Sequence, residues 1–105
     1  MSTQDETPVL DVIGAMTAAS LERSTLPPDS LLMVRIAALA AVDARPVSYL
    51  AHVGPAVESG VTIDTVQGIL VAIAPIIGTA RTMKAAANIS DALGYAIAIL
   101  AAEEE

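Results

Sequence analysis

Apolar residues recur at helical spacing along this chain, and no stretch shows the alternation of a strand. Val9, Val12, Ile13 and Met16 lie three or four residues apart, which predicts an amphipathic helix over residues 8–23. Thr7 followed by Pro8 is typical of a helix start, because threonine is a favoured N-cap and proline suits the first helical position. The sequence Leu-Pro-Pro at 26–28 ends this helix.

A second helix is predicted from Asp29 or Ser30 to about Ala44. Residues 31–42 are apolar on nearly every side, a pattern typical of a helix that packs against several neighbours. Arg35 is the one charged residue in that run, and a buried guanidinium without a partner is costly. We therefore expect Arg35 to lie in an ion pair within the chain or at an interface between subunits.

Prolines and glycines divide the rest of the chain into three further helices. Pro46 is suited to begin a third helix that runs to residue 58, with a kink or a new start at Gly54-Pro55. A fourth helix follows Thr62, which is a favourable N-cap, and it reaches Pro75. A last helix is predicted over residues 80–102.

The predicted fold is therefore all-α, with about five helices in one small domain over residues 7–102. Residues 1–6 are polar, and we expect them to be frayed. Residues 103–105 are three glutamates, which we interpret as a solvated acidic end.

The composition adds that the chain holds more apolar material than one small domain buries. Of its 105 residues, 54% are hydrophobic and 16% are charged, against roughly 45–50% and about 25% in typical domains. A chain of this length buries only around two-thirds of its unfolded surface when it folds alone. We therefore expect copies of the chain to associate and to cover an apolar surface.

Charge and cysteine content exclude several classes of function. The net charge of −7 is opposite to that of a nucleic-acid-binding surface, and it disfavours anionic membranes. The absence of cysteine excludes disulfides, thiolate metal sites and thiol redox chemistry. The longest run without charge, residues 65–80, is shorter than the roughly 20 residues of a membrane-spanning helix. Without a signal-peptide pattern at its start, the sequence predicts a soluble cytoplasmic protein.

Residues 46–78 contain the most distinctive pattern in the chain. A helix bears the only histidine, His52, and is followed by the segment Ala-Val-Glu-Ser-Gly-Val-Thr at 56–62, by Asp64, by an apolar helix and by Gly78. In these features the chain resembles the carboxymuconolactone decarboxylase family, whose fold is shared with alkyl hydroperoxidase D. The resemblance extends over roughly residues 30–94. It implies the all-helical fold of that family and assembly as a homotrimer or a homohexamer.

The chain departs from the peroxide-reducing relatives at the residues that carry their chemistry. Those relatives have Cys-x-x-Cys-x-x-x-His and a glutamate on the preceding helix. Here Arg45 and Ser48 stand at the two cysteine positions, and Met33 stands at the glutamate position. Because a serine hydroxyl cannot form a sulfenic acid or a disulfide, thiol peroxidase activity is excluded.

The decarboxylase relatives need no cysteine, and the resemblance therefore implies a cofactor-free lyase. Loss of carbon dioxide from an unsaturated lactone leaves a delocalised anion, and His52 could return the proton. Ser48, four residues earlier on the same helical face, is a second catalytic candidate. The candidate substrate-binding residues include Arg45 and Arg81, which could hold an anion. Met33 and Ile73, from neighbouring apolar helices, are the other two.

Two functions remain open from the sequence. One is a lyase that uses His52 as acid or base on a small apolar or anionic molecule. The other is a non-catalytic oligomer that acts as a scaffold or binds a small molecule or a partner protein. In both cases no cofactor is expected, and one histidine without cysteine provides too few ligands for a metal site within one subunit.

Overall fold

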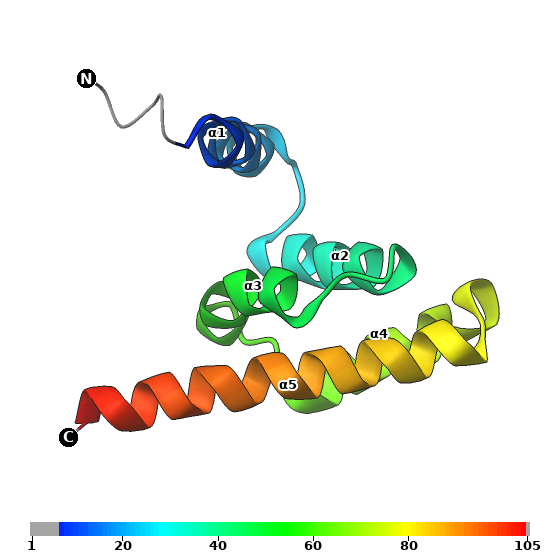
Figure 1. Ribbon diagram of the computed structural model, residues 1–105. Coiled ribbons are helices and arrows are strands. Elements are labelled where there is room, and N and C mark those ends of the chain that lie inside the picture. Colours follow the sequence, from blue (N-terminus) through cyan, green and yellow to red (C-terminus); the bar gives the residue numbers. More distant parts are fainter. Residues whose placement is uncertain (1–6, 105) are drawn as a thin grey trace.

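The computed structural model describes the backbone of residues 7–104, and the side chains of these residues apart from 53, 54, 57 and 95–104. The described residues form five helices and no strand, which confirms the predicted all-α class (Figure 1). In chain order these are α1 (Pro8–Arg23), α2 (Pro28–Ala41), α3 (Pro46–Glu58), α4 (Ile63–Ile77) and α5 (Thr79–Glu104). The fraying expected for residues 1–6 lies outside the described residues, as does residue 105.

The second helix begins earlier and ends earlier than the sequence predicts. Pro27 occupies the N-cap position and Pro28 the first helical position, so Asp29 lies inside the first turn instead of capping it. At the other end, Asp43 has a left-handed backbone conformation with φ of 59°. Ala44 donates its backbone N–H to the carbonyl of Leu39 at 2.9 Å, which closes the helix as in a Schellman motif.

Two prolines lie within helices rather than at their ends. Helix α3 is a single helix through Pro55, so the new start expected at Gly54-Pro55 does not occur. Pro55 lies three residues before the end of α3, where the final turn still forms: Ser59 donates to the Pro55 carbonyl at 3.0 Å. Helix α4 likewise continues past Pro75 to Ile77. The predicted cap of α4 is confirmed, since the Thr62 hydroxyl accepts a hydrogen bond from the Thr65 backbone at 3.2 Å.

Helices α2 to α5 enclose a thin core. Helix α5 is the longest and lies beside α3 and α4, and α2 packs against α3 and α4 (Figure 1). The main cluster of buried side chains comes from all four helices and the loop before α4: Leu31, Leu32, Ile36, Tyr49, Ala56, Val61, Ile69 and Ala92. Among the described residues no large side chain is less than 2% exposed.

Helix α1 lies apart from this core. No α-carbon of α1 comes within 8 Å of another helix, and every one of its side chains is exposed (Figure 1). The helix forms over the predicted residues, but its apolar side chains, such as Val12 and Met16, are not covered within the chain. A hydrogen bond of 2.9 Å from Arg35 Nη2 to Ser20 Oγ connects α1 to α2. Arg35 therefore has a hydroxyl partner, and no ion pair of Arg35 is seen among the described residues.

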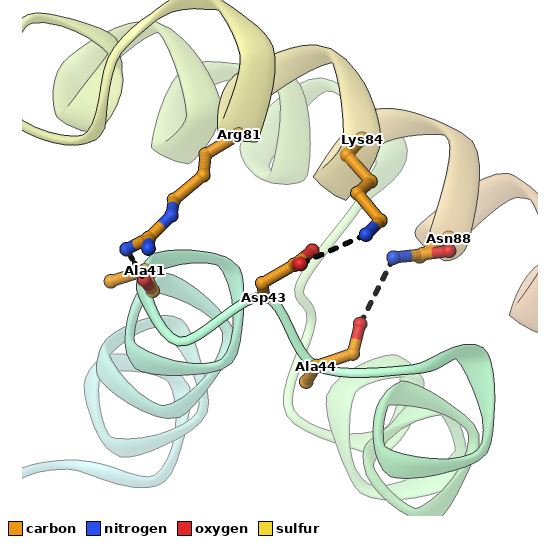
Figure 2. A network of polar contacts seen from close by, with 6 residues as sticks. All are labelled: Ala41, Asp43, Ala44, Arg81, Lys84 and Asn88. Atoms are coloured by element: carbon orange, nitrogen blue, oxygen red, sulfur yellow. Dashed lines mark hydrogen bonds and ion pairs between the residues drawn. The ribbon is translucent and has the colours of Figure 1, made fainter.

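Three polar side chains of α5 hold the loop between α2 and α3 (Figure 2). Arg81 donates to the Ala41 carbonyl at 2.8 Å, Lys84 pairs with Asp43 at 2.9 Å, and Asn88 donates to the Ala44 carbonyl at 3.0 Å. The arginine meets the carboxyl end of α2, where unpaired carbonyls attract a cation. These contacts set where α3 begins, and α3 bears both Tyr49 and His52.

Candidate functional site

His52 is half-buried on α3, and one of its ring nitrogens is already bonded. Its Nδ1 lies 2.9 Å from the backbone carbonyl of Ser48, one helical turn earlier. Because a carbonyl only accepts hydrogen bonds, Nδ1 carries the hydrogen, and in the neutral ring Nε2 holds the lone pair. No second hydrogen bond to the ring is seen among the described residues. Nε2 is therefore free to accept a proton or to deliver one.

A cavity of about 460 Å³ lies between α1 and the helices α2 and α3. We call it the α1 groove. Ile13, Thr17 and Leu21, at successive turns of α1, form one wall, and His52 lines the opposite side. Arg35 and Ser48 also line the groove. The groove thus combines an imidazole, a hydroxyl and a permanent positive charge with walls that are otherwise mainly apolar.

A second and smaller cavity, of about 90 Å³, is also lined by His52. We call it the inner cavity. Most of its lining is apolar, and these side chains come from several helices, among them Ile36 of α2, Val66 of α4 and Ile89 of α5. Thr62 and Ile63, which are exposed, border it at the start of α4. Among the side chains that the structure describes, His52 is therefore the one ionisable group that lines both the α1 groove and the inner cavity.

Tyr49 also lines the inner cavity, and its hydroxyl lacks a partner. The residue is only 4% exposed, and its hydroxyl is buried with no hydrogen bond to any described residue. Burial raises the pKa of Tyr49 above its ordinary value of 10.0, and the negative charge of Asp43 raises it further. The phenol therefore stays protonated at neutral pH and is a hydrogen-bond donor.

The predicted site residues fall into separate parts of the molecule. Ser48 and His52 come together in the α1 groove, as their spacing on one helical face suggests. Met33 and Ile73 come together as well, but in a shallow groove between α2 and α4 that His52 does not line. Arg81 is bonded to the carboxyl end of α2.

Arg45 is exposed and lines none of these cavities. Arg35 and Tyr49 each line a cavity together with His52, but they were not predicted as site residues. The sequence predicts an ion pair for Arg35, and for Tyr49 it indicates no more than side-chain packing. The signal that could have found Arg35 is its isolation as the one charge in an apolar helix.

The described residues contain no group of three or more acidic or histidine side chains that could hold a metal ion. None of the helices within the described residues is both long enough and apolar enough to cross a membrane.

Comparison of the chain with family models, curated proteins and solved structures found no match. The resemblance to the carboxymuconolactone decarboxylases rests on the residues given above. It stays a prediction, together with the arrangement of helices that it implies.

Proposed function

We propose that the protein is a cofactor-free lyase of the carboxymuconolactone decarboxylase kind, with His52 as its acid and base. The observation that carries the proposal is the position of His52: its ring is oriented by the Ser48 carbonyl and lines a groove that also contains the Arg35 guanidinium. An oriented imidazole beside a fixed cation is suited to a small carboxylate.

The proposed reaction is the loss of carbon dioxide from a carboxylated unsaturated lactone. The bond from the ring carbon to the carboxylate breaks, and its electron pair is delocalised over the unsaturated lactone. The protonated His52 then gives a proton to carbon, and the neutral imidazole regains a proton from water. The mainly apolar walls of the α1 groove disfavour a localised charge on the reacting carbon, so the delocalised anion is favoured.

Arg35 is the proposed anchor for the carboxylate. A guanidinium has five N–H donors, and one hydrogen bond to Ser20 leaves the others available to a substrate. Of the five cationic side chains in the chain, Arg35 is the one that lines a cavity together with His52. Arg45 and Arg81 are the anchors suggested by the sequence, and the following experiment separates Arg35 from Arg45.

Arg35→Met is expected to raise the KM for the lactone carboxylate by about ten- to a hundredfold, the value of a charge-assisted hydrogen bond. The methionine keeps the apolar stem and removes the charge, so kcat should change much less. The measurement is the initial rate of carbon dioxide release over a range of substrate concentrations. Arg45→Met is the matched control, because Arg45 is exposed and lines neither cavity at His52.

The methyl ester of the same substrate provides a second control. It cannot lose carbon dioxide, and without the carboxylate it should inhibit the wild type and Arg35→Met equally. A larger effect of Arg45→Met would assign the anchor to Arg45. Absence of carbon dioxide release from the wild-type protein would contradict the lyase and leave the non-catalytic oligomer as the better proposal.

We also propose that the protein works as an assembly of identical copies, whether or not it is an enzyme. The large solvent-exposed surface of the chain favours such an assembly. The chain exposes 7353 Å², whereas a compact protein of 10.7 kDa exposes about 5500 Å². Part of this exposed surface is apolar and is available for contact with other copies.

The α2–α4 face is the proposed contact between copies. It is a shallow apolar groove of about 440 Å³ whose small residues, Ala37, Gly68 and Ala72, would let another helix approach closely. Ile76 follows Ala72 by one helical turn, so it continues the same face. Ile76 is 84% exposed, the most exposed large apolar side chain described.

Ile76→Lys is expected to convert the assembly into monomers at micromolar concentration, because the lysine would carry an unpaired charge into the interface. Sedimentation velocity measures the change directly. Val71→Lys is the control, since Val71 is 74% exposed but lies on another side of α4, and its variant should keep the assembly. A wild-type protein that is a stable monomer would refute self-association, and equal dissociation of both variants would refute the α2–α4 face.

A further inference from the structure

We propose that helix α1 is a hinged cover of the α1 groove, which closes against α3 of the same chain and controls access to His52. This inference goes beyond the proposed lyase, because it concerns how the groove opens and closes and requires no reaction there. The same device would serve a protein that only binds a small molecule.

The side of α1 that faces the groove is mainly apolar and uncovered. Ile13 and Leu21 line the groove, yet they are 49% and 55% exposed. Across the groove, Ala51 and Pro55 of α3 are exposed as well. Two apolar walls that face each other across water are stabilised when they meet, since apolar surface then leaves the water. The groove therefore has a physical reason to close.

Helix α1 is held only lightly in the open position. No α-carbon of the helix lies within 8 Å of another helix (Figure 1). The hydrogen bond of 2.9 Å that connects it to α2 joins the exposed side chains of Arg35 and Ser20. A helix of 16 residues without tertiary packing is only marginally stable in water. Docking onto α3 would therefore stabilise α1 as well as cover the groove.

The linker between α1 and α2, residues 24–27, is a suitable hinge. Ser24 ends α1 in an extended conformation, with φ of −68° and ψ of 137°. Ser24 donates its backbone N–H to the Ser20 carbonyl at 3.0 Å, and Leu26 donates to the Ser24 hydroxyl at 3.2 Å. These hydrogen bonds stay within α1 and the linker. A change of backbone angles at residues 24–26 would therefore turn α1 toward α3 and leave both helices intact.

The linker also favours α1 of the same chain over α1 of a second copy. A short linker keeps the segment that it tethers at an effective concentration of about a millimolar. In a solution of about one micromolar protein, α1 of another copy would compete at a disadvantage of about a thousandfold. The cover of the groove is therefore assigned to the chain's own helix.

Disulfide trapping tests the closure, because the chain has no cysteine of its own. Thr17→Cys with Ala51→Cys, and Leu21→Cys with Pro55→Cys, each place one thiol on either wall of the groove. In the open structure the α-carbons of α1 and α3 are more than 8 Å apart, whereas a disulfide requires less than about 7 Å. With oxidised glutathione and dilute protein, at least one pair is expected to form a disulfide within a single chain, seen as a monomer without free thiols.

The reactivity of His52 is the second readout. Diethyl pyrocarbonate acylates an unprotonated imidazole nitrogen, and His52, the only histidine, has Nε2 free. The reagent is larger than benzene, which fits a cavity of about 150 Å³, so the inner cavity of about 90 Å³ does not admit it. The disulfide-closed protein is expected to react at least about tenfold more slowly than the same variant after reduction, because a closed cover excludes solutes from the groove.

Ala15→Cys with Ala51→Cys is the matched control. Ala15 lies about 200° around α1 from Thr17, on the side turned away from the groove, so this pair should stay reduced. Covalent dimers in place of closed monomers would overturn the proposal and assign the cover to a second copy. Absence of a disulfide in both test pairs, or an unchanged reaction rate of His52 in the closed protein, would also overturn it. Neither readout requires the release of carbon dioxide, so the result is independent of the proposed lyase.

Discussion

Replacing His52 with glutamine is expected to lower the kcat of decarboxylation by about a hundredfold or more, the usual contribution of a positioned acid or base. Glutamine has nearly the size of histidine, and its amide can donate a hydrogen bond toward the Ser48 carbonyl. It cannot exchange a proton near neutral pH. Arg35 and the apolar walls of the α1 groove are unchanged in this variant, so substrate binding and KM should change little.

The measurement is the rate of carbon dioxide release at saturating substrate, with a thermal melt to establish that the variant is folded. Ser48→Ala separates the two catalytic candidates. The bond to His52 comes from the Ser48 backbone carbonyl and survives this substitution, so a much smaller loss is expected. A loss as large as that of His52→Gln would instead indicate a serine nucleophile. Full activity of His52→Gln would refute the role of His52.

Replacing Leu32 with alanine is expected to lower the free energy of unfolding by about 2–5 kcal/mol, the range for a buried leucine in a packed core. Leu32 is 4% exposed and belongs to the main core cluster. The loss is large for this protein, because small domains have a total stability of only about 5–15 kcal/mol. The described core has six buried leucine, isoleucine or tyrosine side chains, and Leu32 is one of them.

Urea denaturation at one fixed protein concentration measures this loss, because association with other copies would add to the apparent stability. Leu10→Ala removes the same atoms from a side chain on α1 that is 66% exposed, and the expected change is within about 0.5 kcal/mol. Equal losses of stability in the two variants would contradict the expectation that Leu10 is exposed. Such a result would mean that α1 is covered in the assembled protein.

Helix starts and ends were predictable where they depend on neighbouring residues. Pro8 occupies the first position of α1 and the Thr62 hydroxyl caps α4, so both helices begin where these residues predict. Of the two outcomes predicted at Pro55, the new helix start does not occur: α3 continues through Pro55, where the loss of one hydrogen bond lies near the helix end and α3 packs against α5. The end of α2 depends on the left-handed conformation of Asp43, which Lys84 of a distant helix helps to hold.

The candidate site was predictable only in part. His52 and Ser48 share a helical face, so their proximity follows from a spacing of four residues. Arg35 and Tyr49 belong to other positions along the chain, and their spacing to His52 does not indicate which cavity each one lines. Met33 and Ile73 do come together, but the packing of α2 on α4 puts them in a groove of their own.

The sequence by itself determined the helical class, the approximate helix limits and the exclusion of thiol chemistry. These depend on the backbone preferences and functional groups of residues taken singly or with near neighbours. Only the tertiary structure decided that α1 leaves a groove beside His52, that Arg35 lines this groove, and that the Tyr49 hydroxyl is buried without a partner. The reason is physical: burial and unmet hydrogen bonds depend on how separate helices pack, and helical periodicity constrains only the faces of each helix.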